Sequence, residues 1–253
     1  MAVIAVFDQK GGVGKTTTAL NLCAGLAQLN LAPLGIDLDP QGHLTLGCGV
    51  TAVSAEASAC AFFQPDAPLE SAVQTLPSGL RLIAAAPELS KVDTLHGGDP
   101  RAATRLKQGI DEFLGRTAPV LIDCCPTLGV LSLNALIAAD RVLIPVSADY
   151  LSLQGVERLD RALNVLETKL KRTFERRVVV TRFDGRRRLS GEIDARIRTL
   201  FGGNVCETRI TENVSLAESP MRGKDIYAHA PASPGARDYR ALTAELSRGG
   251  FFS

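Results

Sequence analysis

A glycine-rich segment between two apolar stretches constrains the fold of this chain most strongly. Residues 2–7 form a short continuous apolar run, as expected for a strand that is buried on both faces. The segment 10–17, KGGVGKTT, follows directly, and residues 16–30 then place apolar side chains on one helical face. Glycines at the start of a helix let backbone N–H groups surround an anion, which the helix dipole also favours. The sequence therefore predicts a strand, a phosphate-binding loop and a helix.

The rest of the chain repeats this alternation of strand and helix patterns. Apolar runs predict further strands at 33–36, 80–84, 120–122, 141–146 and 178–181. Helical patterns occur at 100–115, 155–171, 189–200 and 238–247. Such alternation predicts an α/β fold with a doubly wound, mostly parallel sheet and helices on both faces. Because no internal repeat or long linker occurs, we expect residues 1–253 to form a single domain.

Composition excludes several other classes of protein. The 253 residues are 45% hydrophobic and 22% charged, which does not fit collagen-like, coiled-coil or wholly disordered chains. No run reaches the roughly 18–20 apolar residues of a membrane helix, and no basic stretch precedes the first apolar run. The six cysteines lack C-x-x-C spacing, so we expect buried free thiols. These observations predict a cytoplasmic protein.

The loop itself favours a mononucleotide. Lys15 would reach the β- and γ-phosphates, and the Thr16 hydroxyl would bind Mg²⁺. The strict pattern G-x-x-x-x-G-K-[ST] is not met, because Gln9 stands at the first glycine position. The dinucleotide pattern G-x-G-x-x-G is not met either, because its third glycine position is Thr17. An acid after the second strand, Asp37 or Asp39, would suit that alternative, but the Lys-Thr pair has no place in it.

Taken together, these motifs resemble the ParA/MinD group of P-loop ATPases, whose deviant Walker A motif is KGGxGKT. The resemblance covers almost the whole chain and includes DLDPQGHLT (37–45), VLIDCCPTLGVLSLNAL (120–136), RVLIPVSADYLSLQGV (141–156), VTRFDGRR (180–187), ENVSLAES (212–219) and GKDIYAHAPASPGARDY (223–239). Within the group, the chain is most similar to Soj-type ParA proteins, which position chromosomes, plasmids or large protein assemblies. The resemblance implies a single P-loop ATPase domain that uses ATP and Mg²⁺ with slow intrinsic turnover.

The resemblance also implies roles for individual residues. Lys10 matches the signature lysine that reaches the partner's nucleotide in an ATP-bound homodimer, where a second cation would neutralise developing charge. Asp39 matches the carboxylate that positions the attacking water, although an Asp before a proline also forms turns. Asp123 matches the Walker B acid that holds Mg²⁺ together with Thr16. The expected catalytic residues are Lys10, Lys15 and Asp39, and the expected nucleotide-binding residues are Lys10, Gly11, Gly12, Val13, Gly14, Lys15, Thr16, Thr17 and Asn213.

Cys124 and Cys125 depart from the family pattern, which has Thr or Ala and then Pro after the Walker B acid. Nitrogenase-reductase relatives bridge an iron–sulfur cluster with loop cysteines, but the spacing here does not match theirs. We therefore expect small buried side chains at these two positions.

Positive charge is concentrated in one window, residues 169–188. The window holds nine bases and two acids and so carries +7, in a chain with a net charge of +1. It predicts a local basic patch for phosphate backbones, and the resemblance assigns DNA contacts to the arginines Arg182, Arg186, Arg187 and Arg188. Against this, Glu212 and Ser215 replace two arginines that help the family to hold DNA. A solvated basic face, or one that docks an acidic partner, is the alternative.

The predicted function is that of a ParA-like switch. Two subunits would close on ATP, bind DNA non-specifically, and separate after hydrolysis stimulated by a ParB-like or other partner. The protein would be cytoplasmic and nucleoid-associated. We expect no membrane contact, because residues 246–253 contain two glycines and form no amphipathic helix, and no operator binding, because no helix-turn-helix precedes residue 2. The alternatives are a nucleotide-gated scaffold that docks a protein, and a metabolic enzyme such as a reductase component or an amidoligase.

Overall fold

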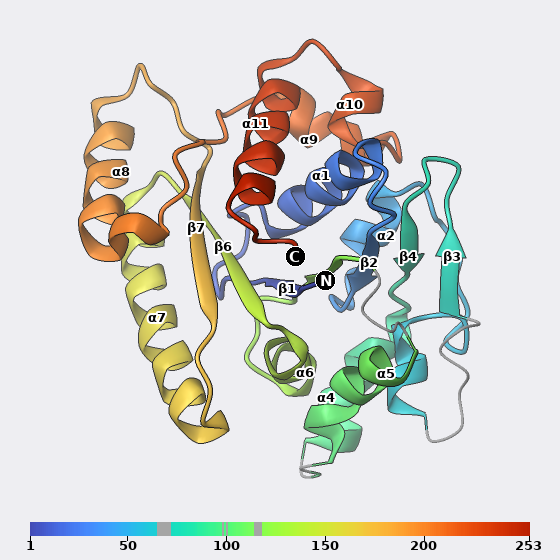
Figure 1. The fold of residues 1–253 in the computed structure, drawn as a ribbon. Helices are drawn as coiled ribbons and strands as arrows, with labels where there is room; N and C mark the ends of the chain where they lie inside the picture. The colour runs from blue at the N-terminus through green and yellow to red at the C-terminus, as the bar shows by residue number, and fades with distance from the viewer. Residues whose placement is uncertain (65–71, 98, 100, 114–117) are drawn as a thin grey trace.

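One seven-stranded sheet forms the centre of the described chain (Figure 1). The computed structural model describes residues 1–64, 72–97, 99, 101–113 and 118–253. The strands lie in the order β3-β4-β2-β5-β1-β6-β7. Their bounds are β1 Val3–Val6, β2 Leu34–Asp37, β3 Val73–Thr75, β4 Arg81–Ile83, β5 Val120–Asp123, β6 Arg141–Ser147 and β7 Glu175–Thr181. Neighbouring strands are parallel except for β3 and β4, as the alternating pattern predicted.

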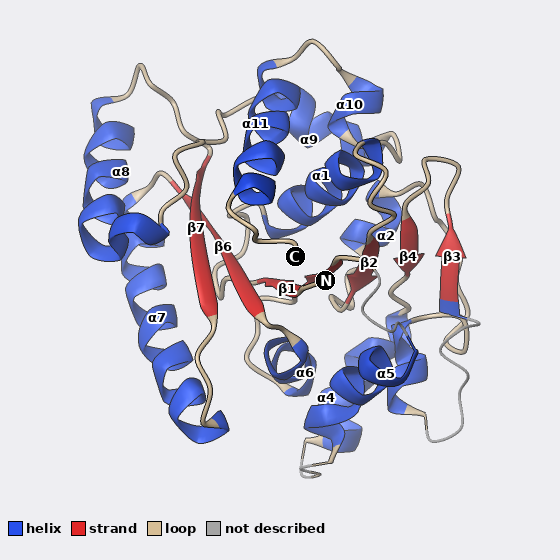
Figure 2. Ribbon diagram, in the orientation of Figure 1, coloured by secondary structure: helices blue, strands red, loops and turns tan. Residues whose placement is uncertain are grey.

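Helices cover both faces of this sheet (Figures 1 and 2). One layer contains α1 (Lys15–Gln28), α2 (His43–Gly47), α9 (Val214–Met221), α10 (Ile226–His229) and α11 (Pro234–Arg248). The other contains α4 (Val92–His96), α5 (Arg105–Phe113), α6 (Val130–Ala138), α7 (Tyr150–Leu170) and α8 (Arg188–Phe201). The doubly wound architecture is therefore confirmed.

The central strand β1 shows why the sheet needs two layers. Val3 and Ala5 belong to the core beneath α5 to α8, whereas Ile4 packs with α1 and α11 and Val6 packs beneath α1 and α2. All four residues of β1 are buried. Because side chains alternate across a strand, a strand covered on both faces must be apolar at every position. The continuous apolar run at 2–7 reflects that requirement.

Three predicted elements begin at least three residues earlier than their apolar patterns indicated. Helix α7 starts at Tyr150 because Asp149 caps it, its Oδ1 accepting the Ser152 N–H at 2.9 Å. Strand β7 starts at Glu175. The apolar pattern missed its first three residues because they are charged and, at the edge of the sheet, exposed or only partly buried. Helix α11 starts at Pro234 behind the Ser233 cap. Strand β3 and helices α2, α4, α6, α9 and α10 were not predicted.

The predicted apolar stripe on α8 is half wrong. Ile193 and Ile197 are buried against the sheet, but Leu189 and Leu200 are 52% and 50% exposed. The predicted helical region 100–115 corresponds to α5 and the turn before it, and positions 100, 114 and 115 lie outside the described residues. In the part of the chain that the structure describes, no helix is both long and apolar enough to cross a membrane.

Candidate nucleotide-binding site

The loop between β1 and α1 has the backbone that its glycines predicted. Gly12 and Gly14 have φ angles of +77° and +92°, a region that residues with side chains rarely adopt. Gly14 is the N-cap of α1, and no side chain caps the helix. The first N–H groups of this 14-residue helix are therefore left to a ligand.

The two lysines of the loop point to different partners. Lys15 is buried, with 7% of its surface exposed, and its Nζ donates to the Lys10 carbonyl oxygen at 2.9 Å. Lys10 extends away from this position toward the start of α7. Its Nζ donates to Asp149 Oδ1 and to Ser152 Oγ, both at 2.7 Å. Lys15 thus stays within the loop, while Lys10 joins the loop to a second element.

The carboxyl ends of β2 and β5 bring buried acids together beside the loop. Asp37 and Asp123 are paired in the register of these adjacent strands. Asp37 accepts hydrogen bonds from the Thr45 N–H and hydroxyl at 2.8 and 2.7 Å and from the Asp39 N–H at 3.1 Å. Burial nevertheless raises the pKa of Asp37 to about 6. Asp39 lines a cavity beside the loop, and its Oδ1 accepts the Gln41 N–H at 3.0 Å.

Asp123 is the carboxylate in this group that is left without partners. It is fully buried, and neither of its oxygens has a hydrogen-bond partner within the described residues. Burial raises its pKa well above the ordinary value, the nearby Asp37 adds to this, and the neighbouring Thr16 hydroxyl opposes it. A buried acid without partners is costly, and a bound divalent cation removes the cost. The donor set of Asp123 and Thr16 fits Mg²⁺.

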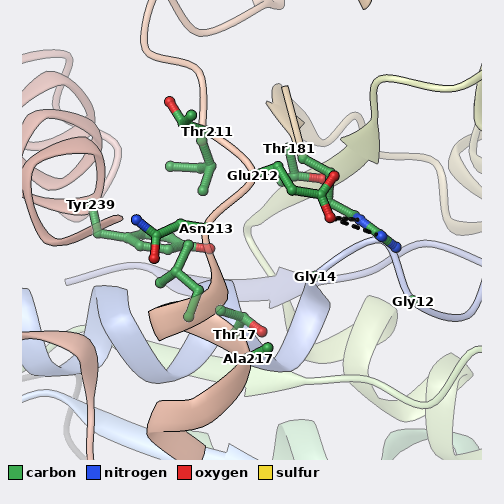
Figure 3. Close-up of a pocket in the computed structure, with 12 residues that line it drawn as sticks. Gly12, Gly14, Thr17, Thr181, Thr211, Glu212, Asn213, Ala217 and Tyr239 are labelled. Carbon is green, nitrogen blue, oxygen red and sulfur yellow. Dashed lines mark hydrogen bonds and ion pairs between the residues drawn. The ribbon is translucent and has the colours of Figure 1, made fainter. Parts of the chain in front are cut away.

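Two cavities flank the loop and share Gly12, Gly14 and Thr17. The larger has a volume of about 710 Å³. It is lined by Gly11, Gly12, Gly14, Lys15, Thr16, Thr17, Asp39, Pro40, Gln41, His43, Ser90, Asp93, Cys125, Pro126 and Thr127. The smaller, of about 300 Å³, is shown in Figure 3 and is lined by Gly12, Gly14, Thr17, Thr181, Arg182, Ile210, Thr211, Glu212, Asn213, Leu216, Ala217 and Tyr239. Most predicted nucleotide-binding residues therefore line one or both cavities, while Val13 is buried beneath the loop.

Asn213 lines the smaller cavity (Figure 3), whereas Asp39 lines the larger one. Its Oδ1 caps α9 by accepting the Ser215 N–H at 2.8 Å, which leaves its amide N–H₂ as a donor. Two other residues that line this cavity, Thr181 and Tyr239, were not predicted from the sequence. Thr181 donates to the Val13 carbonyl oxygen at 2.7 Å, and the Tyr239 hydroxyl lies 3.0 Å from Thr18 Oγ1. Both residues fall within segments that resemble the family, 180–187 and 223–239, but their place in this cavity depends on contacts between distant segments.

The four arginines predicted to bind DNA have different surroundings. Arg182 lines the smaller cavity and forms an ion pair with Glu212 at 3.0 Å (Figure 3). The other three, Arg186, Arg187 and Arg188, follow in the turn before α8 and at its start, and they remain 91%, 72% and 93% exposed. Each of the three is also paired with an acid, Asp184 for the first two and Glu192 for the third.

The expectation of one basic patch at 169–188 is wrong. Lys169 and Lys171 lie before β7, and Arg182 to Arg188 lie beyond its end at Thr181. A strand of seven residues separates the two groups by roughly 20 Å at about 3.3 Å per residue. Arg176 is enclosed by ion pairs with Asp160 and Glu167. Charge clustered along the chain is therefore divided between opposite ends of a strand.

Cys124 and Cys125 are both buried, as expected. Burial raises the pKa of both thiols, so neither is poised as a thiolate. Of the six cysteines, all free, Cys48 is half-buried and the other five are buried. The described residues contain no group of three or more His, Cys, Asp or Glu side chains that could hold a metal ion by themselves.

A glycine loop ending in Lys-Thr between the central strand and its helix, with buried acids at adjacent strand ends, defines a P-loop nucleoside triphosphatase. A family model described as an AAA domain matches residues 1–176. The chromosome-partitioning ATPase Soj of Thermus thermophilus is 43% identical over 245 residues, covering 96% of this chain and 94% of Soj. The chain belongs to the ParA/Soj family of deviant Walker A ATPases.

Two solved structures are similar over nearly the whole chain. Cobyrinic acid a,c-diamide synthase from Mycobacterium smegmatis, with bound ADP and magnesium, has a TM-score of 0.82 and 26% identity, covering 99% of this chain and 95% of the other. McdA from Cyanothece without nucleotide has a TM-score of 0.87 at 22% identity, covering 98% and 99%, and supports the fold alone.

Proposed function

We propose that the chain is an ATPase switch that positions or segregates a plasmid, chromosome or protein cargo. Residues 1–253 would act as one P-loop ATPase domain. ATP would bring two copies together on non-specific DNA, and hydrolysis, slow alone and stimulated by a ParB-like or other partner, would separate them. The observation that carries the proposal is that Lys15, Thr16 and Asp39 line a 710 Å³ cavity at a helix N-terminus, with the unpartnered Asp123 buried behind Thr16.

The two cavities suit the two ends of ATP. Residues 11–17 would hold the phosphates in the larger cavity through backbone N–H groups, with Lys15 on the β- and γ-phosphates. The smaller cavity would take the base, which Asn213 could meet with its free amide donor. Thr16 and Asp123 would hold Mg²⁺, which supplies positive charge to the phosphates when it is bound. The ADP and magnesium in the Mycobacterium smegmatis structure support this assignment.

Hydrolysis would depend on Asp39. Its carboxylate lies at the wall of the larger cavity and has one oxygen held by the Gln41 N–H, so it is oriented before a substrate arrives. It would position and polarise the attacking water, while Lys15 stabilises charge on the transferred phosphoryl group. Lys10 of a second subunit would supply another cation, which makes the symmetric dimer the active form.

DNA binding would use the exposed arginines that follow β7. Arg186, Arg187 and Arg188 project into solvent, and a dimer would present two copies of this group. Their acidic partners weaken the field, and Glu212 offsets the charge of Arg182. This charge balance favours a second candidate, a nucleotide-gated scaffold that docks a protein instead of DNA. Retention on duplex DNA separates the two.

The metabolic alternative rests on the 26% identity to a diamide synthase, whereas the partition ATPase Soj is 43% identical. The higher identity supports the partition role. ATP-dependent consumption of a small substrate in stoichiometric amounts would identify the metabolic role instead.

The test of the switch combines two variants. Lys15→Ala should abolish ATP binding, because it removes the cation of the phosphate loop. Asp39→Ala should bind ATP, release no phosphate, and accumulate as a dimer in sedimentation velocity runs with ATP but not ADP. A monomeric Asp39→Ala protein saturated with ATP would rule out the proposed dimer switch.

A further inference from the structure

One ion pair stands at the edge of the smaller cavity. Arg182 follows β7 and Glu212 precedes α9, and their side chains form an ion pair at 3.0 Å, which the dashed lines from Glu212 mark in Figure 3. A second contact, from Arg182 Nε to the same Glu212 oxygen, is 3.3 Å long. Both residues line the cavity.

The backbones of the two segments are also joined. The Phe183 N–H donates to the Ile210 carbonyl oxygen, and the Glu212 N–H donates to the Phe183 carbonyl oxygen, both at 3.0 Å. Phe183 and Thr211 form a parallel bridge. Arg182 itself has a φ of +50°, an uncommon conformation for a residue with a side chain. The chain therefore fixes Arg182 at the cavity edge, and Glu212 then fixes the direction of its guanidinium.

We propose that Arg182 and Glu212 form a clasp that retains the nucleotide at its base end. Arg182 covers the base, for which a planar guanidinium is suited, and Glu212 acts as the positioning residue that holds it there. The inference rests on the proposed binding of the base in the smaller cavity. It also accounts for an acid at position 212: the acid keeps Arg182 at the nucleotide and away from a phosphate backbone.

The solvent exposure of the Arg182–Glu212 ion pair sets the expected size of its effect on nucleotide release. The side chains of Arg182 and Glu212 are 58% and 47% exposed, so the pair is strongly screened. Pairs of this kind change an equilibrium or a rate by about two- to five-fold. Salt should reduce the effect, because the pair lies within reach of mobile ions.

The test measures dissociation of N-methylanthraniloyl-ADP by stopped-flow chase with excess ADP. Glu212→Gln and Arg182→Gln should each speed release about two- to five-fold, and the double variant should be no faster than the faster single variant. The charge-swapped variant, Arg182→Glu with Glu212→Arg, should restore part of the slow release. Lys107→Gln, which breaks an exposed ion pair with Asp111 on α5, is the matched control and should leave the rate unchanged.

Unchanged release in both single variants, or additive effects in the double variant, would overturn the clasp while leaving the ATPase proposal intact. A wild-type protein that binds no labelled ADP at all would instead overturn the nucleotide-binding proposal, and the clasp with it. Circular dichroism of each variant separates loss of the pair from loss of the fold.

Discussion

The Nζ of Lys10 lies 2.7 Å from Asp149 Oδ1, so the first lysine of the phosphate loop is tied to the N-terminus of α7 in the same subunit. Partial burial opposes ionisation of Asp149. Hydrogen bonds from Lys10, Ser147 and Ser152 outweigh it and hold the pKa of this carboxyl well below its ordinary value. Asp149 is therefore charged near neutral pH. In the proposed dimer Lys10 must serve the partner's nucleotide, so this pair competes with dimer formation.

Asp149→Asn should favour the dimer. Asparagine caps a helix about as well as aspartate, so α7 keeps its first turn while Lys10 loses its charged partner. The pair is partly exposed, so we expect half-maximal dimerisation at about two- to five-fold lower ATP concentration. Sedimentation velocity across an ATP series measures this. Asp160→Asn, which disrupts the pair with Arg176, is the control. A higher ATP requirement in Asp149→Asn would show that Asp149 supports the closed state.

Asp37 predicts a pH dependence of stability in the nucleotide-free protein. Its folded pKa of about 6 lies above the ordinary 3.8, so its contribution to stability is present below pH 4 and is lost as pH rises through 6. Asparagine cannot ionise. The free energy of unfolding of Asp37→Asn relative to wild type, from thermal unfolding, should therefore rise by about 1.4 kcal/mol between pH 5 and pH 7.5, because about one unit of the pKa shift lies above pH 5.

Any fixed cost of losing an oxygen that accepts from Thr45 cancels in this comparison, because it does not vary with pH. Asp111→Asn, which changes a carboxylate on α5 that is 41% exposed, is the control across the same range. A flat difference for Asp37→Asn would mean that Asp37 is ionised in the folded protein at little cost.

The basic residues of 169–188 lie at opposite ends of β7, and we expect only the group that follows β7 to contact DNA. Arg187→Gln and Arg188→Gln should each weaken ATP-dependent DNA binding and lower the slope of log affinity against log salt by up to about 0.9. Their pairs with Asp184 and Glu192 make smaller changes expected. Lys169→Gln and Lys171→Gln, at the opposite end of β7, should change neither quantity. Anisotropy titrations with a labelled duplex measure both. Equal losses in all four variants would indicate contact along the whole of β7.

The fold was largely predictable, because its central strands are buried on both faces and read as continuous apolar runs. Strand β1 and its parallel neighbour β5 are examples, with every residue buried. The bounds of an element were harder to predict where its residues are no longer buried on both faces, and a helix was harder to predict where nearly all of its residues are apolar. Strand β7 begins with charged residues at the sheet edge, and helix α6 (VLSLNALIA) is apolar nearly all round, so it shows little helical periodicity.

The phosphate loop could be predicted because its chemistry is local in the chain. In the smaller cavity, only Asn213 was predicted to bind nucleotide, since Thr181 and Tyr239 reach it from segments far apart in the sequence. The prediction of one basic patch at 169–188 failed because residues close in sequence can lie far apart in the fold. Residues adjacent in sequence, from Lys171 to Arg188, are carried to opposite ends of β7. Charge counted along a chain does not identify a surface until the strands are placed.

Co-sedimentation of Asp39→Ala with non-specific duplex DNA, with ATP or ADP across a salt series, tests the proposed switch most directly. The variant should retain ATP without hydrolysing it and should accumulate as dimer. We expect retention on DNA with ATP only, falling steeply as salt rises, because phosphate contacts release counterions. No retention under conditions where dimers are shown to form would contradict DNA tethering. It would favour the scaffold that docks a protein.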